Sequence, residues 1–295
     1  MSIEYRSKTD KWVKCISSTG TIRAVAISAT ETANFICKRH KLSEAGSIAL
    51  SEGMIAGLIL SSYCKSGEKV NLNIQGSGWC RHAIIDANAD AEVRGYIVER
   101  PQNEVTLARG VGPWGIGLLS VLRTKFQETQ PYIGTVPLIT GRLAKDLTFY
   151  WLQSEQVQSA VGIEVYTDKN GSVIHAEGFL IQALPGATDA DIQTIEEHLK
   201  KLHQFDSDSV IRSSPVHLLS YLLDQQSFSI LEETPLTLKC TSSLDRVNRS
   251  LMLIGQDELK AMLNDHQDVQ INCDLCSEIY TITPDMIAEL ITGTL

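Results

Sequence analysis

Two cysteines near the C-terminal end, Cys273 and Cys276, are separated by two residues. This spacing allows both thiolates to face one tetrahedral metal ion from a single tight turn. The residues on either side alternate as in short strands, which favours a zinc knuckle over a thioredoxin-type site, where the first cysteine opens a long helix. A four-ligand site needs two more donors, and the upstream segment Cys240-Thr241-Ser242 offers only one thiol.

The last part of the chain has to position these cysteines. It is expected to begin near Pro235 and to contain a helix over 257–263 and a closing helix. Thr283 is the predicted cap of the closing helix, because Pro284 suits the first helical position. The cysteine pair is predicted to lie between two short strands, ahead of that closing helix.

Two predicted helices connect this part to the rest of the chain. The first begins at Thr188 or Asp189 and carries an apolar face made of Ile192, Ile195, Leu199 and Leu202. The second begins at Ser214-Pro215, where serine is a suitable cap and proline suits the first turn. Together they are interpreted as a helical linker.

The N-terminal part mixes strands and helices. Two strands are predicted around the Ser18-Thr19-Gly20 turn, and a helix is predicted from Ser43 to about Tyr63, with small residues that suggest close packing against a sheet. Asn170-Gly171 supplies the positive φ angles of a hairpin turn. Because short turns favour antiparallel pairing, the predicted class is α/β or α+β with mostly antiparallel sheets.

The net charge of −9 is distributed unevenly over the 295 residues. Residues 1–180 carry 19 Lys and Arg against 17 Asp and Glu, whereas residues 181–295 carry 7 against 18. An acidic C-terminal part repels phosphate backbones, so nucleic acid is not an expected partner. The longest apolar stretch, Met54–Leu60, is interpreted as too short for a membrane span. The charged N-terminus lacks an apolar signal core, which predicts a cytoplasmic protein.

The order of several motifs resembles the 33 kDa chaperonin family (heat shock protein 33). That family has a C-x-C pair, about thirty residues with a DEL-type helix, and then C-x-x-C. Further similar motifs stand in the family's order and extend the resemblance over essentially the whole chain: Glu92–Tyr96 (EVRGY), Tyr132–Gly134 (YIG), Tyr150–Gln156 (YWLQSEQ) and Gly178–Ala187 (GFLIQALPGA).

The resemblance implies three domains. Residues 1–180 are expected to bind substrate, 181–234 to form the helical linker, and 235–295 to form the zinc-binding, redox-switch domain. In the family, four thiolates hold zinc in the reduced, inactive state. Oxidation forms a disulfide within each cysteine pair, releases zinc and unfolds the switch domain and linker. The exposed apolar surface then holds unfolding client proteins without ATP, and the active form is a homodimer. No catalytic residue is implied.

Two positions depart from the family pattern. Ser242 replaces the second cysteine of the first pair, so the metal ligands that carry over are Cys240, Cys273 and Cys276. The first disulfide cannot form, and Cys273 with Cys276 remains the only redox pair. Glu177 stands where the family commonly has a glycine, and it is expected to affect the hairpin edge or the linker interface.

A serine hydroxyl is a poor zinc ligand, because it is far less acidic than a thiol. Three thiolates can still hold zinc when water or an Asp or His side chain completes the site, and the candidates are Asp245, His266 and Asp274. The competing interpretation is a domain without metal that is stabilised by the packing of its helices. Both interpretations are open from the residues alone.

Two rival function classes follow from the same cysteines. One is a thiol-disulfide oxidoreductase that uses Cys273 and Cys276, and the other is a zinc-knuckle interaction module. Neither explains residues 1–187, so a chaperone that is not an enzyme is the preferred prediction. Its holdase activity is expected to have altered or partial redox control because of Ser242.

Overall fold

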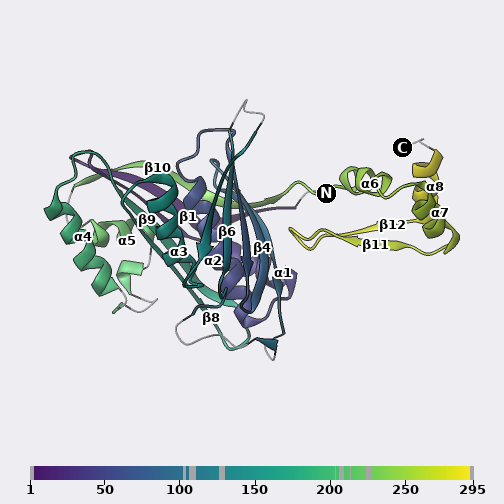
Figure 1. The fold of residues 1–295 in the computed structure, drawn as a ribbon, viewed down its shortest axis with the longest axis horizontal. Helices are drawn as coiled ribbons and strands as arrows, with labels where there is room; N and C mark the ends of the chain where they lie inside the picture. Colours follow the sequence, from purple (N-terminus) through teal and green to yellow (C-terminus); the bar gives the residue numbers. More distant parts are fainter. Residues whose placement is uncertain are drawn as a thin grey trace. The chain divides into compact units, whose positions relative to one another are not determined.

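The computed structural model describes residues 3–101, 104–105, 111–125, 130–202, 204–205, 209–212, 214–223 and 227–292 (Figure 1). The chain forms two compact units: Tyr5–Leu238, here called the core unit, and Lys239–Leu295 with Met1–Glu4, called the C-terminal unit. The assignment of separate roles to 1–180, 181–234 and 235–295 stays a prediction.

The elements follow one another along the chain as β1 Ile3–Ser17, β2 Ile22–Ser28, α1 Thr30–His40, α2 Glu44–Ser61, β3 Lys69–Gly76, β4 Cys80–Asn88, β5 Glu92–Glu99, β6 Gly117–Thr124, β7 Tyr132–Leu138, α3 Leu143–Tyr150, η2 Trp151–Glu155, β8 Ser159–Thr167, β9 Val173–Ala183, α4 Asp189–Leu202, η3 Val210–Arg212, α5 Pro215–Leu222, β10 Phe228–Cys240, α6 Leu244–Met252, α7 Gln256–Asn264, β11 Val269–Asn272, β12 Ile279–Ile282 and α8 Pro284–Thr292.

Ten strands of the described chain form one sheet in the order β7-β6-β3-β4-β5-β10-β1-β2-β9-β8. Sequential hairpins pair antiparallel, as do β3 with β6 and β2 with β9, whereas β10 runs parallel to β5. This confirms the predicted mixed α/β class with mostly antiparallel pairing. Strand β10 comes late in the sequence but lies between β5 and β1 in the middle of the sheet.

Helix α2 packs against the sheet as the small residues predict. Ser43 caps it by accepting a hydrogen bond from the Gly46 amide. A Cβ atom on Gly57 would lie 2.9 Å from Cγ2 of Ile85 on β4, so glycine permits the close approach. The expectation that no apolar stretch reaches the length of a membrane span is wrong, because α2 has 18 residues of mean hydropathy 1.2. However, 83% of this stretch is buried, as in a core helix.

Helices α4 and α5 cover one apolar area of the sheet, called here the covered face. Its residues come from β1, β2 and β9 and are Val13, Cys15, Ile22, Ala24, Ala26, Phe179 and Ile181. Ile195 and Leu202 of α4 and Leu218, Leu219 and Leu222 of α5 pack into the same cluster. Figure 1 shows the two helices beside each other at one end of the sheet. The predicted linker therefore buries its apolar residues on the core.

Local signals fix where these two helices begin. The Thr188 hydroxyl accepts from the Asp191 amide, while the Asp191 carboxylate accepts from the Thr188 amide and hydroxyl, which is a reciprocal cap. The Ser214 hydroxyl accepts from the His217 amide, and Pro215 occupies the first turn of α5. Both helix starts agree with the sequence prediction.

The C-terminal unit has a small apolar core. Helices α6, α7 and α8 and the β11–β12 hairpin contribute to it, and its buried residues are Leu251, Leu259, Ile282, Ile287 and Leu290. Helix α6 is missing from the sequence prediction, although the Ser243 hydroxyl caps it by accepting from the Arg246 amide. A core of this size gives the unit a small free energy of unfolding, so an additional cross-link such as a bound metal ion would stabilise it.

A polar network joins β10 to β1. The Glu232 carboxylate accepts from Nε1 of Trp12 at 3.0 Å and from Nζ of Lys14 at 2.9 Å. Partial burial raises the pKa of Glu232, but the hydrogen bonds from Lys14, Thr234 and Trp12 outweigh it, so the pKa is lowered overall.

We expect Glu232→Gln to weaken the core unit only where this carboxylate is ionised. A lowered native-state pKa contributes stability above the unfolded-state pKa, and that stability is lost as pH falls through the folded-state value. The side chain is 40% exposed, so screening limits the loss at pH 7 to about 0.5 kcal/mol. Urea unfolding at pH 7 and at acidic pH measures the difference, with Glu233→Gln as the control. An equal loss at both pH values would contradict the assignment.

Candidate metal centre

The turn between β11 and β12 holds two of the predicted ligands. Asn272 pairs with Ile279 at the end of the hairpin, and the Cys273 amide donates to the Glu278 carbonyl at 2.8 Å. The amides of Cys276 and Ser277 both donate back to the Cys273 carbonyl, at 3.3 and 2.8 Å. This compact turn places both cysteine side chains on one side. It agrees with the predicted position of the pair between two short strands.

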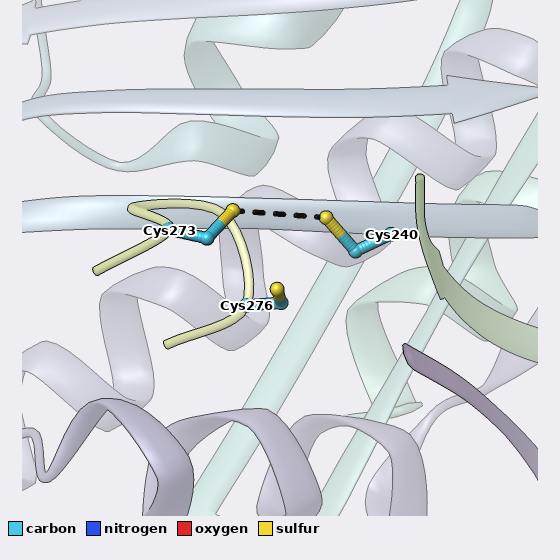
Figure 2. A group of neighbouring side chains, drawn as sticks. All are labelled: Cys240, Cys273 and Cys276. Atoms are coloured by element: carbon cyan, nitrogen blue, oxygen red, sulfur yellow. Dashed lines mark hydrogen bonds between the residues drawn. The ribbon is translucent and has the colours of Figure 1, made fainter. Parts of the chain in front are cut away.

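The third sulfur comes from Cys240, the last residue of β10. The sulfurs of Cys240, Cys273 and Cys276 all lie within 4.8 Å of one another, and those of Cys240 and Cys273 are 3.8 Å apart. Figure 2 shows the Cys240 and Cys273 sulfurs pointing toward each other, with the Cys276 sulfur beside them. Zinc–sulfur bonds of about 2.3 Å in a tetrahedron give sulfur–sulfur edges of about 3.8 Å. The three thiols can therefore hold a metal ion with little rearrangement.

Ser242 lies where a fourth ligand is needed. Its Oγ atom is 3.4 Å from the Cys276 sulfur, and a tetrahedral edge between an oxygen and a sulfur ligand of zinc is about 3.5 Å. The Tyr280 hydroxyl donates to this oxygen at 2.9 Å. The substitution of sulfur by oxygen therefore keeps a polar atom at the site. Tyr280, on β12, is a neighbour that the sequence analysis missed.

The charged side chains considered as a fourth ligand are not in the cluster of the three sulfurs. Among the described residues, the only cluster of histidine, cysteine and carboxylate ligand atoms contains Cys240, Cys273 and Cys276. Asp245, His266 and Asp274 are outside it. The expectation that one of these side chains completes the site is not supported by the geometry, which leaves the Ser242 hydroxyl or water.

The thiols of Cys240 and Cys276 have pKa values shifted in opposite directions. Hydrogen bonds from the Cys273 and Cys276 thiols lower the pKa of Cys240 well below its usual range. The pKa of Cys276 is raised, chiefly because its proton is held by the hydrogen bond to Cys240. Cys240 and Cys276 are buried, while Cys273 is half-buried. A lowered pKa favours the thiolate of Cys240, and the thiolate is the form that binds metal.

The other four cysteines belong to the core unit, and none of them is part of the cluster of three thiols. Cys15, Cys37 and Cys80 are buried, and Cys64 is half-buried. Burial raises the pKa of Cys15 to about 12 and that of Cys37 to about 11, which keeps both thiols protonated. They act as small apolar residues of the core.

Comparison with known families gives a match over most of the chain. The model of the Hsp33 protein family matches residues 10–283. A 33 kDa chaperonin of Geobacter sulfurreducens is 35% identical, and the alignment covers 96% of this chain and 95% of the relative. A 33 kDa chaperonin of Streptococcus agalactiae serotype III is 33% identical, with 97% and 99% covered.

A solved structure has the same fold. The crystal structure of the 33 kDa chaperonin, heat shock protein 33 homologue, from Thermotoga maritima superimposes with a TM-score of 0.85. It is 24% identical and covers 97% of this chain and 98% of that one, which shows similarity of fold alone. With the family match and the relatives above 30% identity, we conclude that the chain belongs to the Hsp33 family, a family of chaperonins.

Proposed function

We propose that the chain is an ATP-independent holdase that binds unfolding proteins and prevents their aggregation. The observation that carries this proposal is the covered face, an apolar area of the sheet against which α4 and α5 pack, together with Ile211 of η3 and Phe228 of β10. An apolar area under two short helices can be uncovered without unfolding the whole sheet. The proposed clients are unfolding proteins, and the proposed location is the cytoplasm.

The chemistry of the covered face suits broad client binding. Its residues are aliphatic or aromatic, apart from the buried thiol of Cys15. Burial of apolar surface contributes about 25 cal/mol per Å² before ordering costs and does not depend on a particular client sequence. We therefore propose weak sequence specificity, a homodimeric active form and no catalytic residue.

We propose that zinc is held by Cys240, Cys273 and Cys276, with the Ser242 hydroxyl or a water as the fourth ligand. The sulfur separations and the position of Oγ fit such a site. When bound, zinc would act as a structural cross-link between the end of β10 and the β11–β12 hairpin. The residues of the chain itself hold the thiolates together and bury two of the three sulfurs.

Redox control is proposed to be partial. Hydrogen peroxide can oxidise the thiols of Cys273 and Cys276: their S–S bond forms, the O–O bond of peroxide breaks, and the two thiol hydrogens leave in the two water molecules formed from peroxide. Ser242 has no sulfur, so Cys240 keeps its thiol. Mild oxidation is therefore expected to lower the count of seven free thiols by two, and an unchanged count would reject the proposed disulfide.

Light scattering from a heat-denatured client enzyme tests the holdase proposal. The chain is assayed under three separate conditions: reduced, heated, and treated with both peroxide and heat. Albumin is the control. Suppression of scattering after at least one of these treatments is the expected result. If no condition suppresses aggregation better than albumin, the proposal is wrong.

The geometry does not favour the oxidoreductase alternative. Cys273 lies in a hairpin turn and not at the start of a helix, so it lacks the helix N-terminus that activates thioredoxin-type thiols. Turnover in an insulin-reduction assay would favour the oxidoreductase alternative over the holdase proposal. A plain zinc-knuckle module would bind a stoichiometric partner and leave client aggregation unchanged.

We expect Ser242→Cys to strengthen metal binding. The new sulfur would stand beside Cys276 and replace an oxygen that is a weak ligand. Zinc affinity is expected to rise by more than about tenfold, measured by competition with a chromogenic chelator. Ser250→Cys, on the exposed side of α6, is the matched control. Equal affinities of Ser242→Cys and the parent chain would show that position 242 is not a ligand position.

A further inference from the structure

Arg212 is a buried cation in the segment between α4 and α5. It ends the short helix η3, and its side chain is only 1% exposed. A guanidinium group is costly to remove from water unless its donors are paired. The groups that bind Arg212 must therefore compensate for the burial of its charge.

The donors of Arg212 reach two different parts of the core unit. On one side, Nε donates to the Phe205 carbonyl at 3.0 Å, and a terminal nitrogen donates to the Leu202 carbonyl at 3.1 Å. Leu202 is the last residue of α4, whose final carbonyls have no partner within the helix. Arg212 thus satisfies and neutralises the C-terminal end of α4.

On the other side, the second terminal nitrogen of Arg212 binds two carboxylates of the β8–β9 hairpin. It pairs with Glu177 of β9, and with Glu164 of β8 at 2.7 Å. Glu177 is itself buried. One side chain therefore links the end of α4 to the sheet and pairs its positive charge with both acids.

Two further polar groups border these acids. The Tyr166 hydroxyl donates to Glu164 at 3.1 Å, and Nε2 of His175 lies 3.5 Å from the Glu177 carboxylate. Tyr166 and His175 belong to β8 and β9, so these two contacts do not reach α4 or α5. In this cluster, Arg212 bonds both to the end of α4 and to the sheet.

We propose that Arg212, Glu177 and Glu164 form a clamp that holds the α4–α5 segment on the sheet. Because one side chain makes all of these bonds, its withdrawal frees the end of α4 and leaves two neighbouring acids without the guanidinium charge. Breaking only some of the bonds of Arg212 is therefore unfavourable. The clamp has two states, one with all of these bonds formed and one with all of them broken. Its opening would uncover the covered face, and this last step rests on the proposed function.

Hydrogen exchange of the full-length chain tests the clamp. In Arg212→Met, amides of α4 and α5 are expected to exchange about 100-fold faster, while those of β3 and β4 keep their protection. Glu177→Gln leaves Glu164 to pair with Arg212 and is expected to accelerate exchange about tenfold. In the double variant the two effects should not add, because both changes break the same contact.

The matched control is Lys200→Met. Lys200 pairs with Glu196 on the exposed side of α4, at 3.9 Å and with both side chains more than half exposed. Removal of this pair should leave exchange unchanged. Exchange rates of α4 and α5 in Arg212→Met within about twofold of the parent would overturn the clamp. If Arg212→Met loses protection throughout the core unit, Glu177→Gln decides: acceleration confined to α4 and α5 supports the clamp, and unchanged exchange overturns it.

A client-aggregation assay on the same variants separates the clamp from the proposed function. Faster exchange in Arg212→Met with no client protection under any condition would support the clamp and reject the holdase. Client protection by the heated parent chain, with unchanged exchange in both variants, would reject the clamp and leave the holdase standing. Faster exchange together with client protection at a lower temperature is the result expected when both hold.

Discussion

Replacing Cys276 with serine is expected to remove the metal from the C-terminal unit. The change deletes one of three thiolates and leaves two oxygens beside two sulfurs, a donor set that zinc binds far more weakly. Elemental analysis of chain purified under reducing conditions should give about one zinc per parent chain and far less than one for the variant.

Loss of the metal should also destabilise this unit. Its apolar core has five buried residues. In small zinc domains, the binding free energy of structural zinc is roughly 10–16 kcal/mol and contributes directly to folding. We expect the α6–α8 helices to melt in Cys276→Ser, as measured by hydrogen exchange of their amides. Cys64→Ser, in the core unit, is the control. A variant that retains full zinc, or a metal-free parent chain whose helices stay protected, would contradict the metal-stabilised interpretation.

Shortening Leu219 to alanine is expected to expose the covered face at a lower temperature. Leu219 of α5 is completely buried against this face, and a leucine-to-alanine change at such a position costs about 2–5 kcal/mol. Because α5 is one short helix docked on the sheet, the loss should fall on its docking more than on the sheet itself.

Binding of an apolar dye during heating measures this exposure. The onset is expected to shift downward by on the order of 10 °C. Leu231→Ala, at a leucine of β10 that is 62% exposed, is the matched control and should leave the onset unchanged. An unshifted onset in Leu219→Ala would show that α5 does not control access to the face.

Truncation experiments need a boundary that respects β10. Thr237 and Leu238 pair with Glu92 and Val93 of β5, and Leu236 and Leu238 are buried. A chain cut at 235 would lose these contacts and weaken the core sheet itself. A chain that ends after Cys240 keeps the whole strand and removes α6, α7, α8 and the β11–β12 hairpin.

Local features of the fold were predictable from the sequence. The caps at Ser43, Thr188 and Ser214 satisfy amides within three residues of themselves, so the signal is contained in a short segment. The knuckle turn is equally local, since Cys273 bonds to residues of its own hairpin. Such elements depend little on the rest of the chain.

Contacts between distant segments were not predictable in this way. The comparison with the family pattern singles out Glu177. It does not indicate that the partner of Glu177 is Arg212, which lies 35 positions further along the chain. Tyr280 reaches Ser242 across 38 positions, and the place of β10 between β5 and β1 depends on the whole sheet. No residue type or spacing encodes these partners; they follow from the tertiary arrangement.

The central place of β10 has a consequence for biosynthesis. Without this strand, the order of the sheet separates into β7-β6-β3-β4-β5 and β1-β2-β9-β8, each with an unpaired edge. A ribosome makes β10 only after all nine of these strands, so the nascent chain carries two open edges until about residue 240 has emerged. We therefore expect incomplete chains to aggregate more readily than the finished chain, because completion of the sheet waits for a segment that ends at Cys240, a proposed metal ligand.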